Sequence, residues 1–148
     1  MTIEARLKSI QAKDMMTKFA ITASEDDTIT DMANLFLRFK ISGVPVVNET
    51  ENIVGIVTAT DLFHHMQKIM DGLDKGEDPV SACAASIKEI MTRTVISVTE
   101  EMTLYDLIKL MGRESIYTFP VVREDKIVGV IGRRDVINAC YTTACSLQ

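Results

Sequence analysis

The sequence predicts an α/β (α+β) protein built from two copies of one small unit. The first observation is an internal repeat, because Pro45 and Pro120 lie 75 residues apart and Asp61 and Asp135 lie 74 residues apart. The second is that each copy shows the order strand, helix, strand, strand, helix. The third is the length of 148 residues, which suits one compact module. We therefore expect two pseudo-twofold-related halves that share one core.

The duplication also sets the expected boundaries, since a repeat this long is a duplicated domain rather than a solenoid unit of about 20 to 50 residues. The expected ranges are an N-terminal helix at 1–12, a first repeat at 13–70, a linker at 71–86, a second repeat at 87–142 and a C-terminal tail at 143–148. The linker assignment rests on the glycines, proline and acidic residues of the segment 71–79.

The elements follow from apolar spacing and turn residues. Thr2 is a suitable cap for a short N-terminal helix, and a short strand is expected at Ala20–Ala23. The acidic and hydroxyl residues 25–28 favour the start of a helix. Its apolar face consists of Ile29, Met32, Ala33 and Phe36. The β-branched runs Val44–Val47 and Ile53–Val57 predict a hairpin, and a second helix is expected from about 58–61 toward Ile69.

The second repeat follows the same order. A strand is expected at Val95–Val98 and a hairpin at Phe119–Val122 and Ile127–Ile131, with the short turn Glu124-Asp125. The helix between them presents an apolar face formed by Leu104, Leu107, Ile108 and Met111. A last helix is expected to start around Arg134-Asp135.

Composition excludes several function classes. The chain is 47% hydrophobic and 25% charged, which is typical of a folded globular protein. It has no run of about 18 apolar residues and a charged N-terminus, so we expect a cytoplasmic protein without a membrane span. The net charge of −5, without a cluster of Lys or Arg, argues against nucleic acid as a partner.

Neither an enzyme nor a metal site is predicted. Cys83, Cys140 and Cys145 are odd in number and lack the paired spacing of a zinc site, so we expect buried free thiols. His64 and His65 are neighbours on a predicted helix and point about 100° apart, which is unsuitable for one shared metal ion. The chain also lacks the common phosphate-loop, zinc-protease and serine-hydrolase motifs.

The segment Gly55–Asp61 carries the clearest candidate site. It runs from a strand into a helix, so free backbone N–H groups and the Thr58 hydroxyl are available to an anionic or hydroxyl-rich ligand. The carboxylate of Asp61 suits the paired hydroxyls of a ribose. A plain helix cap, Thr58-x-x-Asp61, explains the same two residues, and local sequence leaves both explanations open.

The whole pattern occurs twice and resembles the CBS-domain family, named for cystathionine β-synthase. The first copy matches through Gly43–Val47 and Gly55–Asp61, and the second through Phe119–Val122 and Gly129–Asp135. The resemblance covers roughly residues 13–66 and 88–140. It implies a pair of CBS domains, called a Bateman module, which senses adenosine-containing ligands and usually forms a disc-shaped homodimer.

The resemblance also implies two clefts, each formed by the Thr/Asp end of one repeat and the early strand and pre-proline segment of the other. The first cleft would contain Thr58, Asp61, Ser97, Thr118, Phe119 and Pro120. The second would contain Arg134, Asp135, Thr22, Ser42, Gly43, Val44 and Pro45. In the family the aspartate holds the ribose hydroxyls, the hydroxyl residue three positions before it holds ribose or phosphate, and the base lies against apolar strand residues.

The second repeat departs from the family pattern at Gly132, where threonine or serine is usual. That site therefore lacks a side-chain hydroxyl. Arg133 and Arg134 are candidates to compensate through charge-assisted hydrogen bonds to phosphate, each worth about 1.5 to 3 kcal/mol. Both arginines are also explained as solvated residues at the start of a helix.

The leading hypothesis is a non-catalytic regulatory module. It binds an adenine nucleotide (AMP, ADP or ATP) as a regulatory ligand, requires no cofactor, forms a homodimer and signals to a separate target protein. One alternative is a site for S-adenosylmethionine or another adenosyl ligand, which needs no phosphate contacts. Another is a ligand-free dimerisation scaffold, in which both motifs are helix caps.

Overall fold

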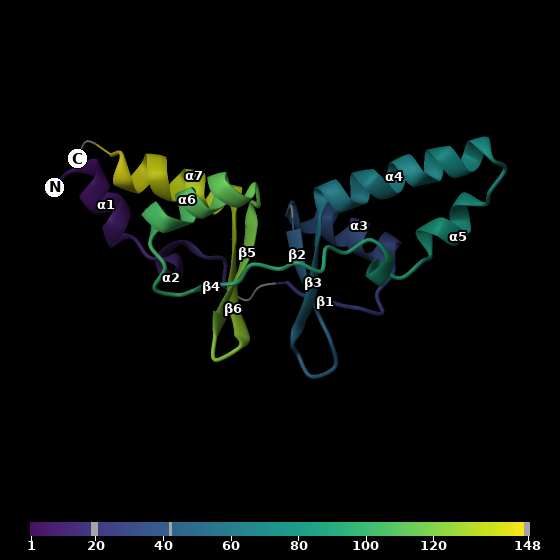
Figure 1. Ribbon diagram of the computed structural model, residues 1–148, viewed down its shortest axis with the longest axis horizontal. Helices are drawn as coiled ribbons and strands as arrows, with labels where there is room; N and C mark the ends of the chain where they lie inside the picture. The colour runs from purple at the N-terminus through teal and green to yellow at the C-terminus, as the bar shows by residue number, and fades with distance from the viewer. Residues whose placement is uncertain (19–20, 42, 147–148) are drawn as a thin grey trace. The chain divides into compact units, whose positions relative to one another are not determined.

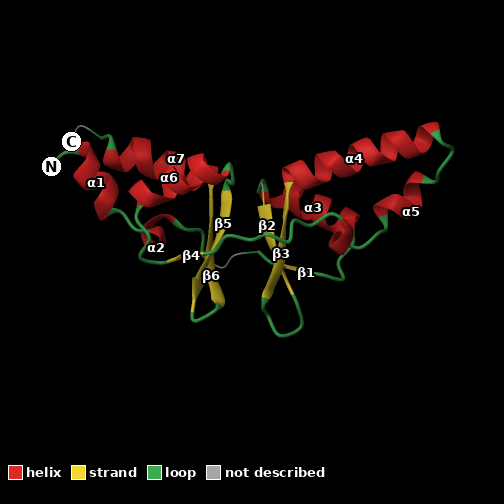
Figure 2. Ribbon diagram, in the orientation of Figure 1, coloured by secondary structure: helices red, strands yellow, loops and turns green. Residues whose placement is uncertain are grey.

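The computed structural model describes residues 1–18, 21–41 and 43–146 (Figures 1 and 2). They belong to two compact units. Residues 21–95 form the first-repeat unit, and residues 1–20 together with 96–148 form the second-repeat unit. Each unit contains a mixed three-stranded sheet with helices, in the order β1-β2-β3 or β4-β5-β6, which confirms the predicted fold class.

The first-repeat unit follows the predicted order of strands and helices. Its elements are β1 (Ala23–Ser24), α3 (Ile29–Phe39), β2 (Gly43–Val47), β3 (Ile53–Thr58), α4 (Ala59–Asp74), α5 (Pro79–Cys83) and the 3-10 turn η1 (Ile87–Glu89). Strand β1 is parallel to β2, and β2 is antiparallel to β3. The predicted start of α3 is confirmed, because the Thr28 side chain accepts a hydrogen bond from the Asp31 N–H.

The second-repeat unit has the same sheet topology and two additional N-terminal helices. Its elements are α1 (Ile3–Ser9), α2 (Ala12–Met15), β4 (Val98–Thr99), α6 (Leu104–Glu114), β5 (Thr118–Arg123), β6 (Lys126–Gly132), α7 (Arg133–Asn138) and the π-helical turn η2 (Ala139–Ala144). The predicted turn at Glu124 and Asp125 is confirmed. Both residues have positive φ, as a tight β-hairpin turn requires.

The buried apolar residues of the described chain form two clusters, one in each unit. Each cluster includes residues from the segment that precedes the other repeat. Ile87 and Met91 are buried in the first-repeat unit, and Ala12 is buried in the second. These segments add the apolar surface that a lone repeat of this size would lack.

The same segments extend the two sheets. Thr92 pairs with Ile56 in β3 through two backbone hydrogen bonds of 2.8 and 2.9 Å, and Thr17 pairs with Val130 in β6 through bonds of 2.9 and 3.1 Å. Each compact unit therefore contains one repeat together with the segment that leads into the other repeat. These lead-in segments are residues 87–92, which belong to the first-repeat unit, and residues 12–17, which belong to the second-repeat unit.

Some element boundaries differ from the prediction. Helix α4 continues to Asp74, into the predicted linker, because Met70 and Leu73 maintain the helical spacing of its apolar residues. Gly72 lets the returning chain approach, since a Cβ there would lie 2.7 Å from Oε2 of Glu77. Strand β1 begins only at Ala23, and residue 20 lies outside the described residues. In the described part of the chain, no helix is long and apolar enough to cross a membrane.

Candidate functional site

The end of the β2–β3 hairpin carries Thr58 and Asp61. The Thr58 N–H donates to Oδ2 of Asp61 at 2.8 Å, and the Thr58 hydroxyl donates to the same oxygen at 3.1 Å. In return, the Asp61 N–H donates to the Thr58 hydroxyl at 3.4 Å. The helix cap proposed from the sequence is therefore present at the start of α4. It fixes the carboxylate at the edge of the sheet.

A residue that sequence analysis missed holds the other carboxylate oxygen. The hydroxyl of Thr92 donates to Oδ1 of Asp61 at 3.1 Å. Thr92 reaches this position because the backbone of its segment pairs with Ile56 in β3. The repeat itself was a usable signal, since Thr17 and Thr92 are 75 residues apart and each directly follows a methionine of the repeat, Met16 or Met91.

The second-repeat unit builds the equivalent arrangement around Asp135. The Gly132 N–H donates to Oδ2 of Asp135 at 2.8 Å. Burial raises the pKa of the Asp135 carboxyl above its usual range, whereas hydrogen bonds from the Gly132 N–H and the Thr17 side chain act in the opposite direction. Asp135 is therefore a half-buried carboxyl with fewer partners than Asp61, because Gly132 has no hydroxyl to offer.

The pre-proline strands lie beside these aspartates within each unit. Gly43 of β2 pairs with Thr58 of β3, and Thr118 of β5 pairs with Gly132 of β6. The residues that follow in both strands are buried: Val44 and Pro45 in one unit, Phe119 and Pro120 in the other. Contacts of these residues with a ligand would therefore use mainly backbone groups.

The remaining predicted site residues are exposed where the structure describes them. Thr22 precedes β1 and Ser97 precedes β4. Arg133 and Arg134 begin α7, and the Arg133 guanidinium lies 4.8 Å from the centre of the Tyr117 ring. Ser42 lies outside the described residues. Each predicted cleft combines residues of both units, so its assembly stays a prediction.

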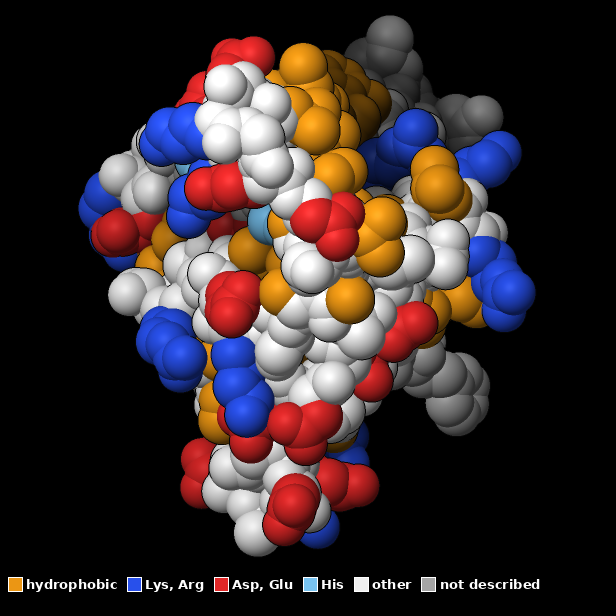
Figure 3. Space-filling model, turned by 90° about the vertical axis from the view of Figure 1, so that its right-hand side faces the viewer, with side chains coloured by type: hydrophobic (Ala, Val, Ile, Leu, Met, Phe, Trp, Pro, Cys, Tyr) orange, Lys and Arg blue, Asp and Glu red, His pale blue; other side chains and the backbone are white. Residues whose placement is uncertain are grey.

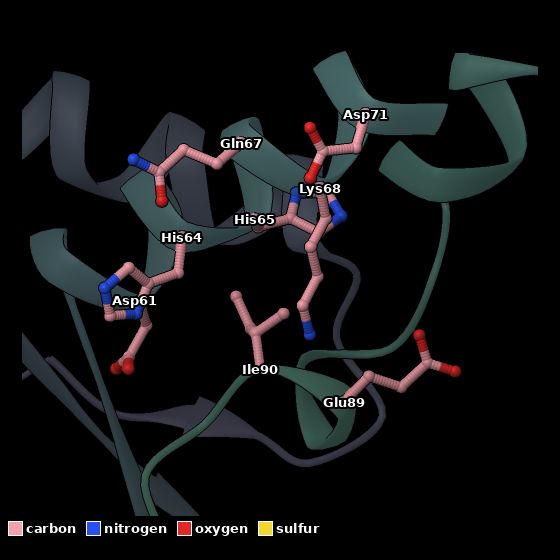
Figure 4. Close-up of a pocket in the computed structure, with 8 residues that line it drawn as sticks. All are labelled: Asp61, His64, His65, Gln67, Lys68, Asp71, Glu89 and Ile90. Atoms are coloured by element: carbon pink, nitrogen blue, oxygen red, sulfur yellow. The ribbon is translucent and has the colours of Figure 1, made fainter. Parts of the chain in front are cut away.

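A groove of about 370 Å³ runs from Asp61 along α4 in the first-repeat unit (Figure 4). Its other lining residues are His64, His65, Gln67, Lys68, Asp71, Glu89 and Ile90. His64 is exposed and His65 is half-buried. Among the described residues, no group of three or more His, Cys, Asp or Glu side chains is arranged to hold a metal ion. The three cysteines are free thiols, as predicted, but half-buried rather than fully buried.

The fold and this repeated arrangement define a tandem domain pair, and its family follows from comparison. The CBS domain family matches residues 12–68 and 87–142. The chain therefore belongs to the CBS domain family, with two CBS domains in tandem, which confirms the resemblance seen in the sequence.

Two similar proteins share most of their length with this chain. The CBS domain-containing protein YhcV of Bacillus subtilis is 30% identical over 124 residues, covering 84% of this chain and 81% of YhcV. The uncharacterized protein MJ1426 of Methanocaldococcus jannaschii is 30% identical over 150 residues, covering 86% of this chain and 89% of that protein. Other relatives are longer: the chain spans 26% of the inosine-5'-monophosphate dehydrogenase of the same organism.

Solved structures agree with the fold. The CBS domain pair of protein MJ0100, in complex with 5'-methylthioadenosine and S-adenosyl-L-methionine, superposes with a TM-score of 0.72. It is 26% identical, and the match covers 89% of this chain and 96% of that one. CBSX2, solved in complex with AMP, also has a TM-score of 0.72 at 21% identity, with 90% of this chain and 97% of CBSX2 covered.

The raised pKa of Asp135 predicts a pH-dependent effect of Asp135→Asn. Between the ordinary pKa of a carboxyl and its raised value in the folded protein, the folded state binds more protons than the unfolded state. Wild-type stability therefore falls as the pH rises through this window. The asparagine variant, whose amide oxygen still accepts from the Gly132 N–H, lacks this loss. Urea unfolding at pH 4 to 7 should show that the free energy of unfolding of the variant rises relative to that of the wild type as the pH rises. If the difference between the two free energies is constant or falls with pH, the raised pKa of Asp135 is contradicted.

Proposed function

We propose that this CBS pair is a non-catalytic regulatory module that binds an adenosine-containing ligand, with AMP, ADP or ATP as the first candidates. CBS pairs are a domain type that binds adenosyl ligands, as CBSX2 and MJ0100 illustrate. One observation carries the proposal. In both units a carboxylate, Asp61 or Asp135, lies at the start of the helix that follows the hairpin and accepts a hydrogen bond from the N–H three positions before it. A threonine of the segment that leads into the opposite repeat lies beside each carboxylate, Thr92 at Asp61 and Thr17 at Asp135.

The chemistry of these groups suits a nucleoside. A carboxylate accepts hydrogen bonds from ribose hydroxyls, and the backbone of the adjacent pre-proline strand offers polar groups to the edge of a base. Arg133 and Arg134 are exposed cations in the same unit as Asp135. In this proposal they bind phosphate oxygens, and several such contacts together supply the roughly 8 kcal/mol that micromolar affinity needs.

Each cleft in this proposal joins the two units. Thr58 and Asp61 act with Ser97, Thr118, Phe119 and Pro120. Arg134 and Asp135 act with Thr22, Ser42, Gly43, Val44 and Pro45. A ligand that contacts both units favours one arrangement of them over others, and this difference in affinity is what a separate target protein would sense.

S-Adenosylmethionine is the second candidate ligand. The observation in its favour is the likeness to MJ0100, whose CBS pair is solved with S-adenosyl-L-methionine and 5'-methylthioadenosine. These ligands carry the same adenosyl group but no phosphate. Under this alternative the two aspartates keep their role, whereas Arg133 and Arg134 contribute nothing to affinity.

Thermal unfolding with AMP, ADP, ATP or S-adenosylmethionine tests the proposal. At about one hundred times Kd, a ligand selective for the folded state adds about 2.7 kcal/mol and raises Tm by roughly 5 to 10 °C. We expect Asp61→Ala and Asp135→Ala to reduce this rise. Asp31→Ala is the matched control, because Asp31 accepts the Thr28 N–H at 3.2 Å and caps α3 in the same way outside the candidate site. An equal loss in the control, or no rise with any ligand, would count against the proposal.

We also propose that the module pairs with a second copy through α4. Four large apolar side chains of this helix recur at the 3-4-3 spacing of a two-helix seam and are 46 to 63% exposed: Phe63, Met66, Met70 and Leu73. Gln67 and Ile69, which flank the central part of this seam, are uncharged, and Asp74 at its end is acidic. Figure 3 shows hydrophobic side chains exposed over the upper part of the face it displays.

A further inference from the structure

Two of the three cysteines lie together in the second-repeat unit. The sulfur atoms of Cys140 and Cys145 are 3.9 Å apart. Cys140 belongs to the π-helical turn η2 and Cys145 ends it. In a π-helical turn, backbone hydrogen bonds join residues five positions apart. One of these bonds joins the two cysteines themselves, since the Cys145 N–H donates to the Cys140 carbonyl oxygen at 2.8 Å. The turn therefore brings both thiols to the same side of the chain.

The rest of the unit holds this turn in place. Ala144 is buried in the core cluster of the second-repeat unit, and Cys140 packs against that cluster. The Arg6 guanidinium of α1 donates to the carbonyl oxygens of Ala144 and Ser146, at 3.3 and 2.5 Å. Figure 1 shows α1 beside the segment that follows α7. Cys145 thus lies between the two residues whose backbone binds α1.

The separation of the two sulfur atoms is short enough for a disulfide bond to form within the turn. Bonded sulfur atoms are about 2.05 Å apart, so closure brings these two about 1.9 Å closer. Rotation about the Cα–Cβ bonds supplies a movement of this size. Both cysteines are half-buried rather than enclosed, so a small oxidant can reach them.

The two thiols differ in their readiness to react. Burial raises the pKa of the Cys140 thiol, and its contact with the Cys145 thiol acts in the same direction. The thiolate is the form that attacks a disulfide. Cys140 is therefore the poorer attacking group, which leaves the first attack to Cys145.

We propose that Cys140 and Cys145 form a site of reversible disulfide formation, which a small-molecule disulfide oxidises. The Cys145 thiolate attacks one sulfur of that molecule, forms a mixed disulfide and releases the first thiolate. The Cys140 thiol then loses its proton and attacks Sγ of Cys145, which releases the second thiolate. Two protein thiols are oxidised, one disulfide is reduced, and the two protons pass to the released thiolates. Excess thiol reverses the reaction.

The new bond restricts the turn on which α1 is docked. Arg6 binds the residues on either side of Cys145, so a crosslink at Cys145 limits the movement of both acceptors. Closing the ring over residues 140–145 also removes conformations from the locally opened state. Amide hydrogens of η2 should therefore exchange roughly tenfold more slowly in the oxidised protein than in the reduced one.

Thiol counting after incubation with oxidised glutathione tests the proposal. The reduced wild type has three thiols. We expect the oxidised protein to retain one, to lose the mass of two hydrogen atoms and to carry no glutathione. Dithiothreitol should restore all three thiols. Cys83→Ser is the matched control, because Cys83 lies in α5 of the first-repeat unit. This variant should change from two thiols to none and close the same bond.

Two further variants, made in the Cys83→Ser background, test the order of attack. In Cys140→Ser the second step is blocked, so glutathione should remain bound to Cys145. In Cys145→Ser only Cys140 is left, and it should acquire glutathione at least about fivefold more slowly. Faster modification of Cys140 would contradict the assigned order.

The wild type gives the outcomes that overturn the proposal. These are retention of all three thiols under excess oxidised glutathione, glutathione bound to Cys145 without closure of the ring, or a disulfide between two chains. Unchanged hydrogen exchange in η2 after closure would overturn the effect assigned to the bond. The proposal does not rest on the adenosine-containing ligand, since all of these measurements are made without it.

Discussion

The variant Gly129→Ala is expected to be about 1 to 3 kcal/mol less stable than the wild type, the usual cost of forcing an extra carbon into a packed site. A Cβ at this position would lie 2.5 Å from Sδ and 2.8 Å from Cγ of Met16, and 3.0 Å from the carbonyl oxygen of Thr17. The methionine side chain can shift. The carbonyl belongs to backbone that pairs with Val130, so relief requires the lead-in segment to move away from β6.

Gly112→Ala is the matched control for this prediction. Gly112 is exposed within α6, and a Cβ there would meet nothing within 4 Å. Alanine should therefore stabilise the helix by about 0.5 to 1 kcal/mol. Gly55→Ala, at the equivalent position of the first repeat, should resemble Gly129→Ala, because its Cβ would lie 2.7 Å from Sδ of Met91. Urea unfolding measures all three, and a stabilised Gly129→Ala would contradict the packing described here.

The double variant Phe63→Glu, Met70→Glu is expected to be monomeric at concentrations where the wild type is dimeric. In the proposed dimer both side chains lie in the seam between two copies of α4. A carboxylate buried there without a partner costs several kcal/mol, so the dimer dissociation constant should rise by at least about 100-fold. Sedimentation equilibrium of both proteins measures this change directly.

Lys68→Glu is the control for the dimer prediction. It introduces the same residue into α4 on the side away from the four apolar side chains, since Lys68 is exposed and lines the groove beside Asp61. The control should remain as dimeric as the wild type. A monomeric wild type, or a dimer that both variants weaken equally, would show that this apolar face is not the interface.

The local structure was largely predictable, because it depends on neighbours in the sequence. The cap of α3 at Thr28 follows from residue types with strong capping preferences, and the turn at Glu124-Asp125 follows from the β-branched runs on either side of it. The apolar face of α3 was also correct, with Ile29 and Met32 buried. In α6 the prediction was less accurate, because Ile108 is 38% exposed and Leu110 is buried instead. Helical spacing defines a stripe, whereas packing decides which edge of the stripe is covered.

The exchange of lead-in segments between the units was not predictable from local patterns. It depends on Met16 and Met91 packing against Gly129 and Gly55, contacts between residues far apart in the sequence. The same exchange places Thr92 beside Asp61 and Thr17 beside Asp135. Sequence analysis therefore found the aspartates and missed the threonines. The spacing of the repeat contained that information, but only the folded chain shows that the two residue types meet.

Calorimetric titration of AMP into the purified wild-type protein and into the Asp61→Ala, Asp135→Ala double variant tests the central claim most directly. We predict saturable binding to the wild type and none to the double variant at the same concentrations, with the variant still folded by circular dichroism. Equal binding by both proteins would contradict the role of the two carboxylates. Absence of binding to the wild type by AMP, ADP, ATP and S-adenosylmethionine alike would contradict the proposal that this CBS pair senses an adenosine-containing ligand.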